Sequence, residues 1–253
     1  MQRERQVPNR LVLSMVLLLT SCHAPRVITV DSKEHPLDVP SAQTRQTAQV
    51  FENTNYLLYL PEEYNKEEKR WPLILYLHGK SLRGDNVEML KSYGLAGLLE
   101  KDLKVPFVVV SPQCPADRYW MTEDETLIRL LDHVVSTYAI DSQRIYVTGH
   151  SMGGRGTWLL AYKHPEKFAA IVPMSDAPLD DAWARQVAKV PAWVFHGTKD
   201  DLEPFERTEQ FVAALKKLGA EVKFTPLPER DHFILDTYEN QEIYDWMLQH
   251  KRS

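Results

Sequence analysis

The stretch Ile145-Tyr146-Val147-Thr148-Gly149-His150-Ser151-Met152-Gly153-Gly154 decides the fold. Its first four residues are apolar or β-branched and predict a strand, and the residues from Gly153 to Lys163 predict a helix. The junction fits G-x-S-x-G, a turn so tight that only glycine two places either side of the serine keeps strand and helix from colliding. The pattern predicts a nucleophile elbow, whose strained apex exposes Ser151.

Strands and helices alternate on both sides of this turn, from about residue 50 to the end of the chain. The expected strands are Tyr56–Leu60, Leu73–Leu77, Phe107–Val110, Arg144–Thr148, Ala170–Pro173, Ala192–Phe195 and Val222–Thr225. The expected helices are Val87–Leu103 with an interruption near Gly94, Thr126–Tyr138, Gly153–Lys163, Phe205–Leu218 and Tyr238–His250. This alternation predicts an α/β fold with a mostly parallel sheet and helices on both faces. Ligands then bind beyond the carboxyl ends of the strands.

A serine hydroxyl needs a base, and in this architecture the chain order is serine, acid, histidine. His164 lies at the far end of the helix that Ser151 begins, and His250 lies in the charged end of the last helix. His196 ends a strand where the acid is expected. His232, in the loop after the last strand, is therefore the predicted base.

The acid should follow the strand that ends at Phe195, where Asp200 and Asp201 are adjacent. Such a carboxylate holds the imidazole in one tautomer and offsets the charge that the ring acquires. We predict Asp200, with Asp201 as the alternative. Asp231, beside His232, is a weaker candidate because neighbouring side chains in an extended loop diverge.

Two backbone amides are expected to form an oxyanion hole. One is the N–H of Met152, which directly follows the serine, and the other comes from the loop after the strand Leu73–Leu77. In that loop Gly79 allows close approach of the backbone to the nucleophile, and the N–H of Lys80 is the predicted second donor. Trp120 is expected to line the substrate pocket.

Further motifs match a known family in order and spacing. They are Tyr56-Leu57-Leu58-Tyr59-Leu60-Pro61, Leu77-His78-Gly79 with Arg83-Gly84-Asp85, Ser111-Pro112-Gln113-Cys114-Pro115 with Trp120, the elbow, His196-Gly197-x-x-Asp200 with Pro204, and Asp236-x-Tyr238 through Tyr244-Asp245-Trp246. From about Phe51 to its end the chain resembles the α/β-hydrolases of the carboxylesterase and feruloyl-esterase-like group, which includes predicted peptidases and polyhydroxybutyrate-depolymerase-like proteins. The resemblance implies Ser151, Asp200 and His232 as the catalytic triad. Lys80-Ser81 departs from the small residues and glycine usual in that loop, and Asp231 replaces a common glycine.

Composition and charge exclude several other functions. The 253 residues carry a net charge of -5 with basic residues spread thinly, so no nucleic-acid footprint is visible. Only Cys22 and Cys114 are present, too few for a disulfide framework or a multi-thiolate zinc site. His78, His150 and His196 adjoin tight turns without carboxylate-rich ligand spacing. We expect neither a metal nor a cofactor.

The first 21 residues predict a lipoprotein signal peptide. Arg3, Arg5 and Arg10 precede the apolar run Leu11–Leu19, which is too short to span a bilayer. Leu19-Thr20-Ser21-Cys22 resembles a bacterial lipobox, which makes Cys22 the lipidated first residue of the mature chain. Residues 22–49 are then a tether and residues 50–253 the hydrolase domain. We expect a cell-envelope protein that meets the membrane through its lipid anchor only, or a secreted one if Cys22 is not lipidated.

Together these features predict a serine hydrolase that cleaves small-molecule or polysaccharide-linked carboxylic esters, with acetyl or feruloyl esters as examples. A small serine peptidase is the alternative within enzymes. A non-catalytic envelope binding protein on the same scaffold is the alternative outside them.

Overall fold

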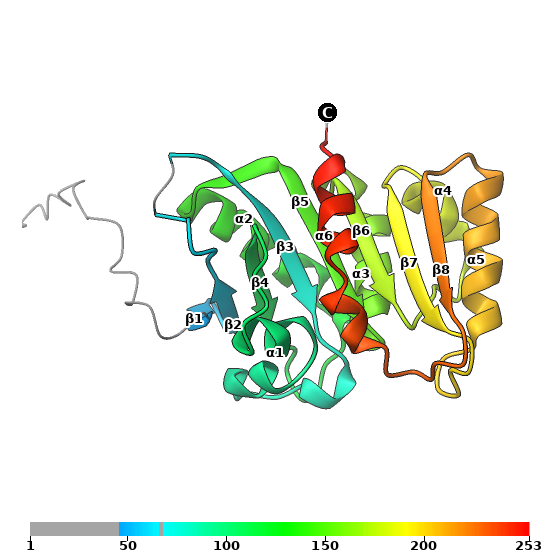
Figure 1. The fold of residues 1–253 in the computed structure, drawn as a ribbon, viewed down its shortest axis with the longest axis horizontal. Helices are drawn as coiled ribbons and strands as arrows, with labels where there is room; N and C mark the ends of the chain where they lie inside the picture. Colours follow the sequence, from blue (N-terminus) through cyan, green and yellow to red (C-terminus); the bar gives the residue numbers. More distant parts are fainter. Residues whose placement is uncertain (1–45, 66–67, 253) are drawn as a thin grey trace, which may run out of the picture. The chain divides into compact units, whose positions relative to one another are not determined.

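The structure is a computed structural model that describes residues 46–65 and 68–252. Within them, one eight-stranded sheet has the order β1-β2-β4-β3-β5-β6-β7-β8 (Figure 1). The strands are β1 (Gln46–Phe51), β2 (Thr54–Tyr59), β3 (Trp71–Leu77), β4 (Val108–Pro112), β5 (Ile140–His150), β6 (Ala170–Met174), β7 (Ala192–Gly197) and β8 (Val222–Leu227). β1 and β2 pair antiparallel, β2 runs antiparallel to β4, and all neighbours from β4 to β8 are parallel. The mostly parallel sheet agrees with the expected fold class.

Helices cover both faces of the sheet. They are α1 (Gly94–Glu100), α2 (Asp124–Thr137), α3 (Met152–Lys163), α4 (Ala184–Val187), α5 (Phe205–Lys217) and α6 (Gln241–Gln249). α1 and α6 pack on one face, and α2, α3, α4 and α5 pack on the other. Two apolar cores result, one on each side of the sheet.

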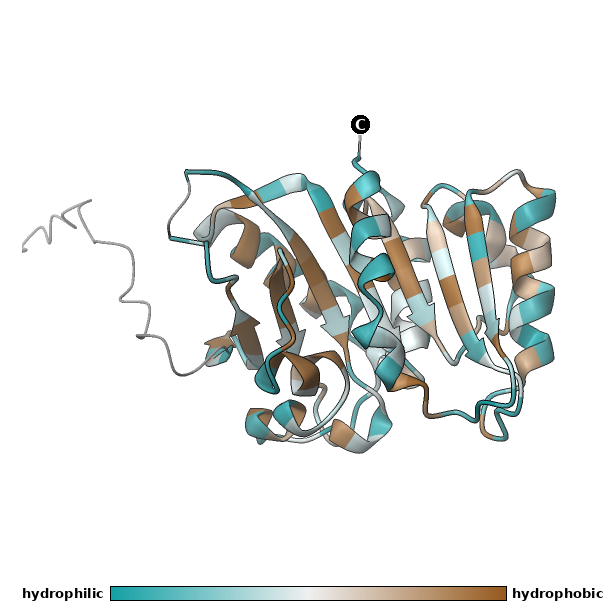
Figure 2. Cartoon of the chain, in the orientation of Figure 1, coloured by the Kyte–Doolittle hydropathy of each residue, from teal (hydrophilic) through white to brown (hydrophobic). Residues whose placement is uncertain are grey.

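The central strands are buried on both faces, and β3 shows how. All seven of its residues are buried. Leu73, Leu75 and Leu77 belong to the core under α2 and α3, and the alternating Ile74 and Tyr76 belong to the core under α1 and α6. Figure 2 shows the same pattern, with hydrophobic colour along the inner strands and a hydrophilic outer side on α6. The carboxyl ends of these strands, where ligands are expected to bind, therefore belong to a sheet that is covered by helices on both faces.

The structure differs from the expected boundaries at the start of the domain. β1 begins at Gln46, four residues before the domain start expected at residue 50. The Gln46 side chain is buried and donates a hydrogen bond to the Ala96 carbonyl over 2.8 Å. A buried polar residue on an edge strand does not add to the apolar pattern from which strands are predicted. The start of β1 is therefore set by its backbone pairing with β2. The predicted signal peptide, Cys22 and most of the tether lie outside the described residues.

The expected interruption of the first helix does occur near Gly94. A 3₁₀ helix over Val87–Ser92 precedes α1, and Gly94 has a φ of 63°. A Cβ there would lie 1.9 Å from the hydroxyl oxygen of Tyr76.

Within the described part of the chain, no helix combines the length and apolar composition needed to cross a bilayer.

Candidate active site

Ser151 occupies a one-residue turn between β5, which ends at His150, and α3, which begins at Met152. Its φ is 56° and its ψ is -122°, a strained conformation for a residue with a side chain. A Cβ on Gly149 would lie 2.5 Å from the backbone of Gly153, and one on Gly153 would lie 1.9 Å from the carbonyl oxygen of Leu77. Both glycines are sterically required, and the turn leaves Ser151 half-buried at the carboxyl edge of the sheet.

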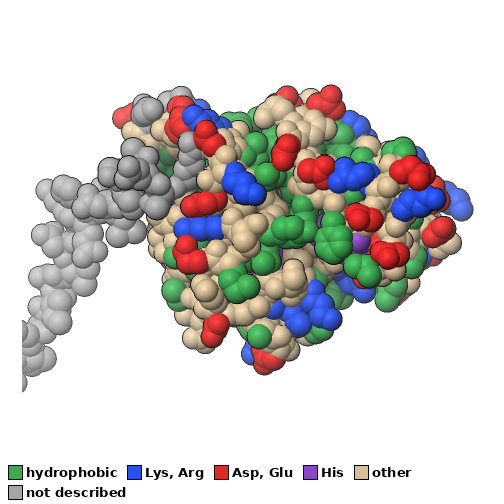
Figure 3. All heavy atoms as spheres, turned by 60° about the horizontal axis from the view of Figure 1, so that its bottom comes forward, with side chains coloured by type: hydrophobic (Ala, Val, Ile, Leu, Met, Phe, Trp, Pro, Cys, Tyr) green, Lys and Arg blue, Asp and Glu red, His purple; other side chains and the backbone are tan. Residues whose placement is uncertain are grey.

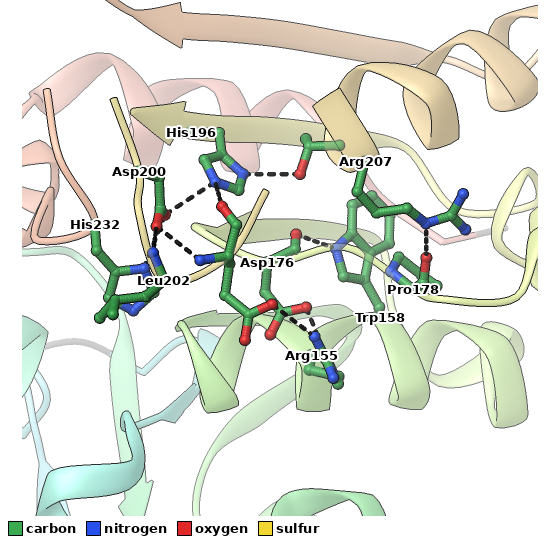
Figure 4. Close-up of polar contacts among 11 residues, drawn as sticks. Arg155, Trp158, Asp176, Pro178, His196, Asp200, Leu202, Arg207 and His232 are labelled. Atoms are coloured by element: carbon green, nitrogen blue, oxygen red, sulfur yellow. Dashed lines mark hydrogen bonds and ion pairs between the residues drawn. The ribbon is translucent and has the colours of Figure 1, made fainter. Parts of the chain in front are cut away.

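His232 and Asp200 meet at this edge, from the loops after β8 and β7. The Nδ1 of His232 lies 2.8 Å from Oδ2 of Asp200 (Figure 4). The other oxygen, Oδ1, accepts hydrogen bonds from the amides of Leu202 and Glu203 over 2.9 and 2.8 Å. Asp201 is exposed, and Asp231 accepts a hydrogen bond from the amide of Phe233. Of the three candidate acids, the structure therefore brings Asp200 to the imidazole.

The Asp200 carboxylate is stabilised in its charged form. Burial opposes its ionisation, but hydrogen bonds from His196, His232 and the two loop amides outweigh that effect and hold the pKa of Asp200 well below its usual range. Asp200 is thus a fixed negative charge beside the His232 ring. Because Nδ1 faces the carboxylate, Nε2 is the ring nitrogen that can take a proton from a nucleophile.

His232 is held next to the elbow through its own backbone. Its carbonyl oxygen accepts hydrogen bonds from Nε2 of His150 over 2.6 Å and from Oγ of Ser175 over 3.0 Å. His150 directly precedes Ser151, and the rings of His150 and His232 have centroids 4.8 Å apart. The loop that carries His232 and the turn that carries Ser151 are therefore neighbours.

The predicted oxyanion loop passes beside the nucleophile. A Cβ built on Gly79 would lie 3.9 Å from Cβ of Ser151. Lys80 begins a short 3₁₀ helix directly after Gly79, and Met152 is the first residue of α3. The first amides of a helix have no partner within it, so the N–H of Met152 is free to face a developing negative charge.

His78, which the sequence analysis treated as a loop residue, orients this loop. Its Nε2 accepts a hydrogen bond from the amide of Cys114 over 3.0 Å, so Nδ1 carries the hydrogen and donates it to the carbonyl oxygen of Gly79 over 2.7 Å. Burial lowers the pKa of His78 to about 4, which keeps the ring neutral. The carbonyl of Gly79 and the N–H of Lys80 share one planar peptide and point in opposite directions. His78 therefore fixes the direction of the Lys80 donor.

Trp120 does not line open space, in contrast to the prediction. Its side chain is 1% exposed, and its indole N–H donates to the carbonyl oxygen of His78 over 2.9 Å. The side chain is drawn inward because its N–H finds that buried carbonyl while its ring packs against Gly156 of α3. Trp120 therefore supports the loop that carries Gly79 and Lys80 from its buried side, through the hydrogen bond to His78. The neighbouring Tyr119 is an exposed aromatic residue.

A charged cluster that the sequence analysis missed ties α3 to the acid loop. Arg155 donates to Asp176 over 2.8 Å and to Glu203 over 2.9 Å (Figure 4). The amide of Glu203 in turn holds Asp200. Burial raises the pKa of Asp176 to about 8, although Arg155 favours its charged form. The partners of Arg155 lie 21 and 48 residues away, so only its place one helical turn after Ser151 hinted at a role.

Among the residues that the structure describes, no three His, Cys, Asp or Glu side chains are grouped so as to hold a metal ion. The site is instead a serine on a strained turn, an imidazole, a charged carboxylate and two directed amides. Such a set can carry out nucleophilic attack on a carbonyl carbon.

Comparison with known proteins finds relatives that are named as an esterase and as a depolymerase. The bifunctional acetylxylan esterase/xylanase of Neocallimastix patriciarum is 29% identical over 152 residues, which are 56% of this chain and 21% of that protein. The poly(3-hydroxyoctanoate) depolymerase of Pseudomonas fluorescens is 26% identical over 178 residues, which are 60% of this chain and 64% of that protein. The chain thus spans less than two thirds of the length of either relative.

The crystal structure of a thermostable esterase superposes with a TM-score of 0.71 at 26% identity, covering 82% of this chain and 64% of that one. The fold is that of an α/β-hydrolase. The family model described as "Putative esterase" matches residues 48–217, well over half of the chain. The chain therefore belongs to the esterase family that this model describes.

Proposed function

We propose that the protein hydrolyses carboxylic esters with Ser151, His232 and Asp200 as its catalytic triad. The observation that carries the proposal is the 2.8 Å contact between Asp200 and His232, made beside the strained turn that leaves Ser151 half-buried at the carboxyl edge of the sheet. Membership of an esterase family supports the reaction class.

The reaction has two steps. The Oγ of Ser151 attacks the ester carbonyl while Nε2 of His232 takes its proton, and the amides of Met152 and Lys80 stabilise the oxyanion. Collapse of this intermediate breaks the ester bond, and His232 protonates the departing alcohol. Water then attacks the acyl-enzyme with His232 again as base, which releases the acid and restores Ser151. Asp200 keeps its charge throughout and stabilises the imidazolium that forms twice per cycle.

For the substrate we propose an acyl ester carried on a polysaccharide, such as an acetyl or feruloyl ester. Five apolar side chains are exposed on the loops that follow β4, β6, β7 and β8, namely Tyr119, Met121, Leu179, Leu202 and Phe233. Figure 3 looks onto this end of the sheet and shows hydrophobic side chains gathered around histidine atoms. An apolar rim suits an acyl group. The name of the acetylxylan esterase relative supports a polysaccharide carrier.

Labelling with a fluorophosphonate tests the triad. We expect the wild-type protein to be labelled and Ser151→Ala to be unlabelled, because the probe bonds only to an activated serine. Asp200→Asn should lose at least about a thousandfold in kcat, because the wrong tautomer of His232 is then held, whereas Asp201→Asn, the matched control, should keep it within about twofold. Folded wild-type protein that takes up no label, or Ser151→Ala that still does, would contradict the proposal.

A substrate panel separates the remaining candidates. We expect acetyl and feruloyl esters to be cleaved, and peptide p-nitroanilides to be cleaved at least about a hundredfold more slowly in kcat/KM. Faster cleavage of the anilides would make the protein a peptidase, and no turnover of any substrate would favour a binding protein.

A further inference from the structure

Two imidazole rings meet the same oxygen of Asp200. Oδ2 lies 2.8 Å from Nδ1 of His232 and 3.0 Å from Nε2 of His196 (Figure 4). His196 lies within β7, four residues before Asp200, and its side chain is 0% exposed. The triad mechanism as described above gives this second ring no role.

The surroundings of His196 settle which nitrogen carries its hydrogen. Nε2 also lies 3.1 Å from the carbonyl oxygen of Glu203. A carboxylate and a carbonyl oxygen only accept hydrogen bonds, so Nε2 is the protonated nitrogen. Nδ1 lies 2.8 Å from the buried hydroxyl of Thr208 on α5, which can donate to it. The ring is fixed from both sides as an Nε2–H donor.

The ring has little freedom to turn away. The Phe205 ring packs edge-on against it with centroids 5.8 Å apart. The titratable groups around it are Asp200, His232 and His150, and the Glu203 carboxylate beside them is paired with Arg155. The Nε2–H of His196 is therefore directed at two acceptors, Oδ2 of Asp200 and the carbonyl oxygen of Glu203, of which Asp200 alone is charged.

We propose that His196 is a positioning residue that holds Oδ2 of Asp200 and moderates how strongly this carboxylate favours the charged form of His232. A carboxylate oxygen that accepts from two donors stabilises the positive charge on either one less than it would with a single donor. With His196 present, Asp200 orients the His232 ring while part of its charge is directed at a second donor. This inference rests on the proposed triad.

Three variants test it. His196→Leu keeps the approximate bulk of the side chain and removes the donor, and His196→Gln restores an amide N–H at the reach of Nε2. Thr208→Val is the matched control, because it removes a buried hydrogen bond from the other ring nitrogen and leaves the Nε2–H donor facing Asp200. For each variant kcat and KM of ester hydrolysis are measured from pH 5 to 9, and folding is followed by thermal unfolding.

In His196→Leu we expect kcat to fall roughly tenfold to a hundredfold, KM to change less than about threefold, and the acidic midpoint of the activity profile to rise by roughly half a pH unit or more. His196→Gln should recover most of both changes, and Thr208→Val should keep the wild-type midpoint. A folded His196→Leu protein with wild-type kcat and midpoint would overturn the proposal. Equal losses in the Leu and Gln variants with an unmoved midpoint would reduce His196 to a packing role.

A measurement on the wild-type protein guards against a variant that does not fold. In a protein with ¹⁵N-labelled histidine, NMR should show that the Nε2 of His196, assigned with His196→Gln, carries a proton. The opposite tautomer would overturn the proposal. Fluorophosphonate labelling of the wild type separates the two hypotheses: absence of labelling refutes the triad, and labelling with unaltered His196 variants refutes only this inference.

Discussion

At the scale of single residues, three buried histidines each hold one part of the site. His78 donates a hydrogen bond to the carbonyl oxygen of Gly79, and His150 donates one to the carbonyl oxygen of His232. The Nε2 of His196 lies 3.0 Å from Oδ2 of Asp200. All three stand at or just beyond the carboxyl end of a strand. A neutral imidazole donates on one side and accepts on the other from a rigid plane, so it can fix a peptide or a carboxylate with little loss of side-chain entropy.

The histidine before the nucleophile gives the fold a dependence on pH. Burial lowers the pKa of His150 to about 4, against about 6.5 for an exposed histidine. Between these two values the unfolded chain binds a proton that the folded chain does not, so stability falls as the pH drops through this window. We expect the free energy of unfolding to fall by about 3 kcal/mol more in wild type than in His150→Gln between pH 7 and pH 4.

Urea unfolding at the two pH values measures this difference. Other titrating groups, Asp176 and Asp200 among them, are present in both proteins, so their contributions cancel in the comparison. Parallel pH dependences in the two proteins would show that His150 is not held neutral by the fold.

At the scale of elements, the site depends on how closely α3 approaches β3. The carbonyl oxygen of Leu77 would lie 1.9 Å from a Cβ on Gly153, whereas a Cβ on Gly79 would have no contact nearer than 3.6 Å. The first clash is with backbone, so the whole start of the helix has to move to relieve it. The second position has ordinary van der Waals room.

These two glycines form a matched pair for mutation. Gly153→Ala should lower the free energy of unfolding by about 3 kcal/mol or more and abolish fluorophosphonate labelling, because the elbow is displaced. Gly79→Ala should stay within about 1 kcal/mol of wild type. Urea unfolding gives both numbers. Equal stability of the two variants would mean that the contact between α3 and β3 is not tight.

The sequence predicts the elements that carry strong local signals. The glycines of the elbow predict the turn, and the strands that are buried on both faces are predicted by their continuous apolar runs. Asp200 could not be separated from Asp201 with certainty, because the loop amides of Leu202 and Glu203 decide which carboxylate turns inward. The inward turn of Trp120 depends on a carbonyl 42 residues away, and the partners of Arg155 are also distant in sequence. Contacts of this kind have no periodicity.

At the scale of the whole molecule, every part of the site comes from the carboxyl end of a strand. The loops after β3, β5, β7 and β8 supply Gly79, Ser151, Asp200 and His232. The sheet order places β5 beside β3 and β6, with β7 and β8 following in sequence. Four loops thus converge on one edge, as expected for parallel sheets.

The whole chain is also predicted to be anchored in a membrane, since we propose that Cys22 is lipidated. Each buried methylene of an acyl chain contributes about 0.8 kcal/mol of membrane affinity. In bacterial cells the full chain should incorporate labelled palmitate and sediment with membranes, and Cys22→Ala should do neither. Cys114→Ala is the matched control, because Cys114 is buried within the hydrolase domain. Membrane association that persists in unlabelled Cys22→Ala would refute the lipid anchor.

The backbone anchoring of His232 has a practical consequence. Gly219, between α5 and β8, has open space around it and is exposed, so the polypeptide can be divided there. The proposed nucleophile, Ser151, and acid, Asp200, then reside on the larger fragment, and the proposed base, His232, resides on the smaller one. In the reassociated protein, His150 at the end of β5 and Ser175 directly after β6 hydrogen-bond the carbonyl oxygen of His232. Because the proposed triad is divided between the fragments, we expect neither to hydrolyse esters by itself, and turnover of a chromogenic ester then reports their reassociation.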